Sequence, residues 1–198
     1  MPEQLWLPGL EAPAAITDGL FFAVYPHVLA AAEIARRGQQ LCASLRGRGK
    51  PLAANRLHVT LHHLGNFAGG LPQEKVEAAM RAAASIAVAP FSVEFDRATS
   101  FAPKLRAGPL VLCGGEGVVG LRQLHDMLGE ALERAGFEPG EGGKAYTPHV
   151  TLAYGMPWIA EQPAEAIAWN VHEFVLMHSL LGRTRHVALG RWPLLANA

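Results

Sequence analysis

The stretch that decides the fold is Leu57-His58-Val59-Thr60-Leu61-His62-His63-Leu64, because its core, His-Val-Thr-Leu at residues 58–61, returns at residues 149–152. Both copies lie in short apolar and β-branched runs, which are typical of strands. With nine histidines and six threonines in the chain, chance gives about 0.3 His-x-Thr pairs, so two copies have a probability of roughly 3%. The repeat therefore predicts two equivalent strands.

Strand geometry assigns a face to each motif side chain, because side chains two residues apart point to the same side. We expect His58 to point with Thr60, and His149 with Thr151, while the valines and leucines face the core. His62 is expected on the face of His58, and His63 on the opposite face. Two such strands facing each other place two imidazoles and two hydroxyls around one cleft.

The remaining elements follow from periodicity and from the positions of glycine and proline. The predicted strands are residues 20–25, 57–64, 91–95, 110–113, 149–154, 171–181 and 184–192. The predicted helices are residues 27–45, 73–87 and 118–135, and residues 138–147 form a glycine-rich loop. Strands interleaved with helices but without regular crossovers predict an α+β fold with antiparallel sheets.

Composition limits the domain organisation and the possible partners. Half of the 198 residues are apolar, which suits one compact domain at residues 19–198, preceded by a proline-rich tail at residues 1–18. Lys plus Arg and Asp plus Glu are equal at 17 each, so the whole molecule has no net field that attracts a polyanion. We therefore expect any contact with nucleic acid to be local.

Cysteine usage and hydropathy indicate the compartment. Cys42 and Cys113 match neither a disulfide framework nor a zinc site, and both are expected to be reduced. The sequence has no basic leader and no apolar stretch of about 18 residues. These features predict a cytoplasmic protein without a membrane anchor, and we expect it to be a monomer.

The two imidazoles and two hydroxyls suit the hydrolysis of a phosphodiester. That reaction needs a base for the attacking water, an acid for the leaving oxygen, and donors to the phosphate oxygens. Imidazole titrates near pH ~6.5, so we expect one histidine to be neutral and the other protonated. Thr60 and Thr151 supply neutral donors, and the scheme requires no cofactor or metal.

A zinc site at His58, His62 and His63 is the competing interpretation of this cluster. His-x-x-x-His binds zinc when it lies on a helix, but the residues between these histidines favour a strand. No Asp, Glu or Cys lies nearby in the sequence to complete the site.

The sequence resembles the 2H phosphoesterase superfamily, and within it the bacterial RNA 2',3'-cyclic phosphodiesterases, also called 2'-5' RNA ligases. Besides the two motifs, the resemblance rests on residues 20–24, the segment Asn55 to Gly65 and the ending Gly190 to Leu194. The resemblance covers about residues 20–194. It implies a bilobal pseudo-twofold fold, in which antiparallel sheets line a central cleft with helices outside and each lobe carries one HxTx motif.

The resemblance also implies an activity and the roles of the motif residues. The activity is hydrolysis of a 2',3'-cyclic phosphate at an RNA end to a 2'-phosphomonoester, with weak reverse 2'-5' ligation. His58 would be the proton donor to the leaving 3' oxygen and His149 the proton acceptor that activates water. Thr60 and Thr151 would hold the phosphate.

The sequence departs from the family at two places. Relatives often carry a basic residue shortly after the second motif, where this chain has Ala153-Tyr154, and an aromatic residue in the final hairpin, where it has His186. Arg183 and Arg185 are therefore the candidates for neutralising the phosphate. The alternative interpretation is that they form the solvated tip of a hairpin.

Three further residues are candidates for substrate binding. Tyr154 or Phe21 could stack on a base, although Phe21 is equally a core residue. His62, if it lines the cleft, is the third candidate.

Two other functions stay open from the sequence alone. The same site suits a small cyclic nucleotide or a 2'-5' oligonucleotide as substrate. The twin motifs could also bind phosphate without breaking a bond, which would make the protein a non-catalytic module for RNA ends.

Overall fold

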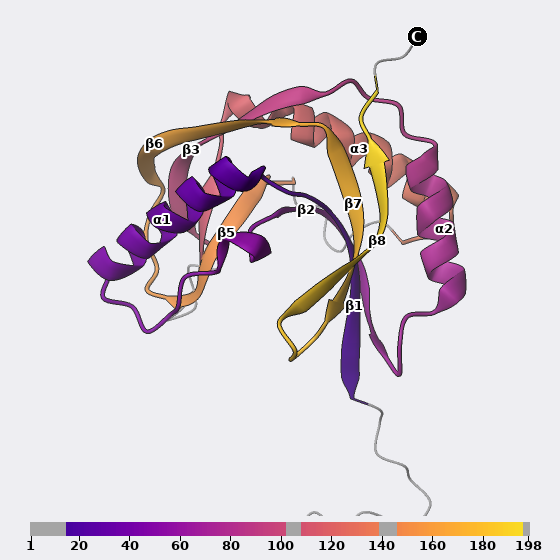
Figure 1. The fold of residues 1–198 in the computed structure, drawn as a ribbon, viewed down its shortest axis with the longest axis horizontal. Coiled ribbons are helices and arrows are strands. Elements are labelled where there is room, and N and C mark those ends of the chain that lie inside the picture. Colours follow the sequence, from indigo (N-terminus) through magenta and orange to yellow (C-terminus); the bar gives the residue numbers. More distant parts are fainter. Residues whose placement is uncertain (1–14, 102–107, 139–145, 196–198) are drawn as a thin grey trace, which may run out of the picture.

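The computed structural model describes residues 15–101, 108–138 and 146–195 and has an α+β fold (Figure 1). Its strands are β1 (Ile16–Val24), β2 (Val59–Ala68), β3 (Phe91–Ser100), β4 (Gly108–Cys113), β5 (His149–Met156), β6 (Gln162–Val171), β7 (Glu173–Leu180) and β8 (Arg185–Pro193). Its helices are α1 (Val28–Ser44), α2 (Gln73–Ala84) and α3 (Val119–Arg134), with short 3-10 turns η1 (Ala54–Arg56) and η2 (Glu116–Val118). None of the helices in the described ranges is long and apolar enough to cross a membrane.

Two expectations about the secondary structure were wrong: one strand was not expected, and another begins earlier than expected. Strand β6 was not expected, because Pro163 and the neighbouring alanine and glutamate residues hide its pattern; only Ile167, Trp169 and Val171 alternate as buried residues. As the edge strand of the sheet, β6 tolerates a proline. Strand β1 also begins at Ile16, within the expected tail of residues 1–18; residues 1–14 of that tail lie outside the described residues.

Asp18 explains why β1 extends into the expected tail. Its carboxylate is buried and accepts hydrogen bonds from the Thr17 hydroxyl at 2.6 Å and from the Gly70 amide at 3.1 Å. The carboxylate also pairs with the His178 imidazole on β7 at 2.5 Å. These hydrogen bonds hold the pKa of Asp18 below its ordinary value, and the start of β1 is fixed by side-chain contacts that the sequence does not show.

The eight strands form one antiparallel sheet in the order β6-β3-β4-β5-β2-β1-β7-β8. The sheet consists of two four-stranded halves, each with a His-Val-Thr-Leu strand at its inner edge: β5 in one half and β2 in the other. In the described part of the chain, β2 and β5 pair at a single position, Val59 with Val150. The expected antiparallel α+β architecture is confirmed, with the two halves continuous through this one pair.

The core lies between the sheet and the helices. Leu20, Phe22 and Val24 of β1 join the main cluster, whereas Phe21 and Ala23 belong to a second, smaller cluster on the opposite face with Val175 and Met177. Both faces of β1 are therefore buried, which is why its sequence is a continuous apolar run rather than an alternation. Helix α1 packs on β5 and β6, and α3 packs on β2 and β3. In Figure 1, α1 and α2 lie on opposite sides of the molecule, with β1 and the β7–β8 hairpin between them.

A side-chain hydrogen bond also joins the two halves beside the Val59–Val150 pair. The hydroxyl of Tyr146, three residues before β5, donates to the backbone carbonyl of Thr60 on β2 at 2.9 Å. Burial of this hydroxyl raises the pKa of Tyr146, so the group is a neutral donor at any ordinary pH.

Replacing Tyr146 with phenylalanine should lower the free energy of unfolding by about 1 kcal/mol, because one buried hydrogen bond is lost. Tyr25 provides a matched control, since its hydroxyl is also buried but has no hydrogen-bond partner within the described residues. Tyr25→Phe should be neutral or stabilising. Urea unfolding of both variants measures the difference, and equal losses in the two would contradict the assigned role of the Tyr146 hydroxyl.

Candidate active site

The two motif histidines are oriented by the same local hydrogen bond. The Nδ1 atom of His58 lies 2.8 Å from the carbonyl oxygen of Arg56, and that of His149 lies 2.9 Å from the carbonyl oxygen of Thr147. Because a carbonyl only accepts, Nδ1 carries the proton in both neutral rings and donates it. The Nε2 atoms are therefore the basic nitrogens, and no hydrogen bond to the described residues occupies either of them.

Both motifs also contain the same irregularity in their strands. On β2, Thr60 pairs with Ala23 and His62 with Phe22, so Leu61 is an extra residue. On β5, Thr151 pairs with Val111 and Ala153 with Leu110, so Leu152 is the extra residue. Such a β-bulge places two residues opposite one and reverses the alternation beyond it.

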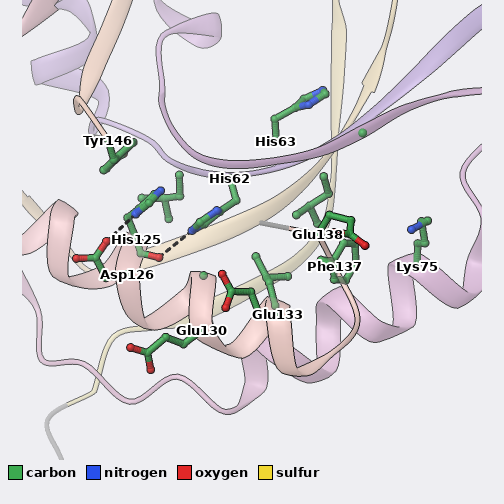
Figure 2. A pocket seen from close by; sticks show the side chains of 15 residues that line it. His62, His63, Lys75, His125, Asp126, Glu130, Glu133, Phe137, Glu138 and Tyr146 are labelled. Carbon is green, nitrogen blue, oxygen red and sulfur yellow. Dashed lines mark hydrogen bonds and ion pairs between the residues drawn. The ribbon is translucent and has the colours of Figure 1, made fainter. Parts of the chain in front are cut away.

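The bulges correct the expected faces of His62 and His63. Beyond Leu61 the alternation is reversed, so His62 faces α3 and His63 returns to the side of His58 and Thr60. In Figure 2 the two imidazoles point to opposite sides of the strand. His62 is therefore not part of the cleft, whereas His63, which we expected on the opposite face, lines it.

The register of the Val59–Val150 pair brings the two motifs together on one face. When this antiparallel register is extended by one residue in each direction, His58 lies opposite Thr151 and Thr60 lies opposite His149. Directly opposed side chains lie about 5 Å apart at Cβ, and diagonal ones about 7–8 Å. Each imidazole thus lies across from the hydroxyl of the other motif.

A cavity of about 270 Å³ opens on this face. Its lining comes from both half-sheets: Gly19, Phe21, Leu52, Arg56, His58, Thr60, His63, Asn66, Thr151, Tyr154, Ser179, Leu181 and His186. His149 is not one of the lining residues, but it is half-buried next to them, with its ring edge-on to Phe101 at 4.7 Å between centroids.

His58 lies among aromatic rings. The centroids of Phe21, Tyr25 and His186 are 5.2, 5.6 and 5.5 Å from that of His58. The pKa of His58 is lowered to about 4, mainly by burial; the hydrogen bond to the Arg56 carbonyl opposes this shift, and the nearby charges of His186, His149 and Arg56 add to it.

Burial also lowers the pKa of His149 below its ordinary value. In the ligand-free protein the neutral form of both motif histidines is therefore favoured. The reason is desolvation, which penalises the charged imidazolium. An anionic phosphate between the two rings would oppose this penalty and raise both pKa values.

Arg56 is a site residue that we did not predict. It lines the cavity, its Nε is buried without a hydrogen-bond partner in the described part of the chain, and its charge lowers the pKa of both His58 and His186. Of the lining residues described, Arg56 is the only permanent cation, and none is a carboxylate. The available signal was its basic side chain, two residues before the first motif histidine.

The other predicted substrate-binding residues have mixed outcomes. Tyr154 lines the cavity and is 60% exposed, which leaves a ring face accessible. Phe21 also lines the cavity but is only 6% exposed, because it packs against His58 and His186. Arg183 and Arg185 are exposed at the β7–β8 hairpin and are absent from the cavity lining.

His186 occupies the place where the family resemblance implies an aromatic residue. Its ring packs edge-on against Phe21 at 5.2 Å and against His58 at 5.5 Å between centroids. Burial lowers its pKa, with a further contribution from Arg56, so the ring is a neutral packing partner of His58.

His62 lies instead in a stack of three rings under β2 (Figure 2). Its ring centroid is 4.1 Å from that of His125 on α3, which in turn is 3.9 Å from that of Tyr146. The Nε2 of His62 donates to the His125 carbonyl at 2.8 Å, and Gly129 leaves room for the ring, since a Cβ there would lie 3.1 Å from His62 Cε1. Among the residues described, no cluster of three or more His, Cys, Asp or Glu is arranged to hold a metal ion.

Comparison with known proteins agrees with this geometry. The family model of the 2'-5' RNA ligase superfamily matches residues 26–183. The RNA 2',3'-cyclic phosphodiesterase of Escherichia coli K12 is 32% identical over 150 residues, which are 74% of this chain and 80% of that protein.

Solved structures are similar over nearly the whole chain. A crystal structure titled phosphoesterase has a TM-score of 0.70 at 30% identity, covering 90% of this chain and 99% of the other. E. coli LigT complexed with 3'-AMP has a TM-score of 0.67 at 29% identity, covering 90% and 98%. TT0787 of Thermus thermophilus, at 22% identity with a TM-score of 0.73, covers 91% and 100% and shares the fold. The duplicated motif, the two half-sheets and the family match lead to one conclusion: this chain belongs to the 2'-5' RNA ligase superfamily.

Proposed function

We propose that this protein hydrolyses 2',3'-cyclic phosphates at RNA ends to 2'-phosphomonoesters by acid-base catalysis between His58 and His149. The single observation that carries the proposal is the shared orientation of the two imidazoles. Each is held through Nδ1 by a carbonyl two residues earlier, with its Nε2 not engaged by the described residues. The E. coli relative, named RNA 2',3'-cyclic phosphodiesterase, supports the same activity.

In the proposed reaction a water oxygen attacks phosphorus and the bond from phosphorus to the 3' oxygen breaks. His149 Nε2 accepts the proton of the water, and His58 Nε2 donates its proton to the leaving 3' oxygen. The product is a 2'-phosphomonoester with a free 3'-hydroxyl. His149 ends protonated and His58 neutral, so one proton exchange through solvent restores the starting state.

Three other groups would hold the phosphate. The hydroxyls of Thr60 and Thr151 face the same side as the two rings and donate to non-bridging oxygens. Arg56 supplies the positive charge, because it is the only permanent cation of the described cavity lining. The charge of bound phosphate would also raise the pKa of His58 and favour the protonated donor.

The same site would accept a ribose 5'-hydroxyl in place of water. The hydroxyl oxygen would attack phosphorus, the 3' oxygen would leave, and a 2'-5' linkage would form without ATP. Because water competes for the same position, this ligation is expected to be weak.

The activity is tested by incubating the purified protein with RNA ending in a 2',3'-cyclic phosphate and with 2',3'-cyclic AMP, each with and without EDTA. The expected product is the 2'-phosphate in both conditions, identified by chromatography against 2'- and 3'-phosphate standards. Turnover of the mononucleotide alone would favour a small cyclic nucleotide as substrate. Binding of the RNA without any product would favour a non-catalytic binding module and overturn the proposal.

Alanine at His58 or at His149 should lower kcat by about 10²–10⁴-fold, because each ring transfers one proton in the rate-limiting chemistry. Alanine at Thr60 or Thr151 should have a smaller effect, since each removes one neutral hydrogen bond. His172→Ala is the matched control, because that side chain is exposed between β6 and β7. Unchanged turnover in both motif-histidine variants would exclude the mechanism.

The pH dependence of kcat/KM should be bell-shaped with its maximum in the acidic range. The free protein needs His58 protonated and His149 neutral, and burial lowers the pKa of both rings, that of His58 to about 4, so both limbs lie below pH 6.5. Above the second limb kcat/KM should fall about tenfold per pH unit. The kcat profile should lie at higher pH, because bound phosphate raises the pKa of both histidines. A kcat/KM that is constant from pH 5 to pH 8 would contradict this assignment.

A further inference from the structure

The charges of the chain are unevenly distributed along the segment that leads into the site. Residues 34–73 contain none of the 17 acidic residues of the protein but six of its 17 basic residues. Two of the six, Arg36 and Arg37, are paired with Glu33, and Arg37 also with Glu165. The remaining four are Arg46, Arg48, Lys50 and the cavity residue Arg56.

Residues 46–50, which we call the basic loop, are held in a fixed place against β5. The Leu52 amide donates to the Leu152 carbonyl at 2.7 Å, and Pro51 forms an antiparallel bridge with Ala153. A Cβ on Gly49 would lie 2.0 Å from the Tyr154 carbonyl oxygen, and one on Gly47 would lie 2.6 Å from Met156 Cε.

The same contacts direct the charges of the basic loop outward. Gly47 and Gly49 are half-buried against β5, whereas Arg46, Arg48 and Lys50 between and beside them are exposed. No salt bridge joins these three cations to any carboxylate in the described residues. Their charge is therefore available to a ligand, although the net charge of the whole protein is zero.

The basic loop also borders the cavity of the active site. Leu52, two residues after it, and Arg56 line that cavity, and so does Tyr154, whose carbonyl Gly49 approaches. The 60% exposed ring of Tyr154 thus lies where the loop and the cavity meet. Exposed cations beside an accessible aromatic ring are the combination that binds single-stranded nucleic acid, through phosphates and stacked bases respectively.

We propose that the basic loop binds the phosphates of the nucleotides that precede the RNA end, so that the protein binds an RNA chain more tightly than a mononucleotide. This inference rests on the proposed function for the position of the RNA end in the cavity. It adds a second contact region outside that cavity, with Tyr154 stacking on a base between the two. The preferred ligand is then a single strand several nucleotides long.

The test compares binding of two probes: a fluorescent ten-nucleotide RNA ending in a 2'-phosphate, measured by anisotropy, and 2'-AMP, measured by calorimetry. The variant Arg46→Gln/Arg48→Gln removes two charges of the basic loop. Arg81→Gln/Arg134→Gln removes two exposed charges of α2 and α3 as a matched control. Circular dichroism and thermal unfolding check that both variants are folded.

The basic-loop variant should weaken RNA binding about tenfold at low salt and reduce the slope of log Kd against log salt by about 1.4, or about 0.7 per lost phosphate contact. Its binding of 2'-AMP should stay within about twofold of wild type, and the control should match wild type for both probes. The inference is overturned by unchanged RNA binding in the basic-loop variant, by equal loss for 2'-AMP, or by equal loss in the control. The same loss in Arg183→Gln/Arg185→Gln but not in the basic-loop variant would move the surface to the β7–β8 hairpin and also overturn it.

These measurements do not depend on turnover, so the two proposals can fail separately. A wild-type protein that shows the expected RNA binding but forms no product would overturn the proposed function and support the basic loop. A protein that hydrolyses cyclic phosphates but binds RNA equally well without these two arginines would overturn the basic loop alone.

Discussion

The geometry of the site depends on the one place in the described sheet where its two halves pair, Val59 with Val150. Because opposed residues share a face, this pair fixes which side chains of the two motifs meet. A shift of one residue would turn one motif's imidazole and hydroxyl into the core and its apolar residues into the cavity. The buried valines of the motifs therefore set the register that the histidines and threonines require. Their side chains never face the cavity, yet the arrangement cannot form without them.

The twin bulges serve the same arrangement. A regular strand would carry its alternation past the motif and point His62 into the cleft. The extra residues Leu61 and Leu152 are both buried, and they bring His63 and Tyr154 to the cavity from the two halves. The sequence repeats only the four residues His-Val-Thr-Leu. The structure repeats the backbone conformation as far as the fifth residue after each motif histidine, His63 and Tyr154.

Burial and the charge of Arg56 both favour neutral His58 in the free protein, whereas a bound anion favours the protonated ring. The aromatic surroundings of His58 and the charge of Arg56 keep the imidazole neutral in the free protein. The same low-dielectric surroundings strengthen the attraction between these groups and a bound anion. Residues 34–73 contain no acidic residue, so the preference for an anion extends beyond the cavity. A protein with zero net charge can in this way present a locally basic path to a polyanion.

The sequence by itself determined the α+β class, seven of the strands, the three helices and the identity of the paired motifs, because these depend on local periodicity and on an improbable repeat. It could not determine that β6 exists, since Pro163 and its neighbours obscure the alternation of an edge strand. It also misplaced His62 and His63, because a bulge changes the face of every later residue and leaves no mark in the residue types. The place of Arg56 in the cavity lining, the burial of Phe21 and the lowered pKa of both imidazoles depend on segments that are distant in the chain. Only the tertiary structure decided them, because the face, depth and charge surroundings of a side chain are set by the strands, helices and loops packed against it.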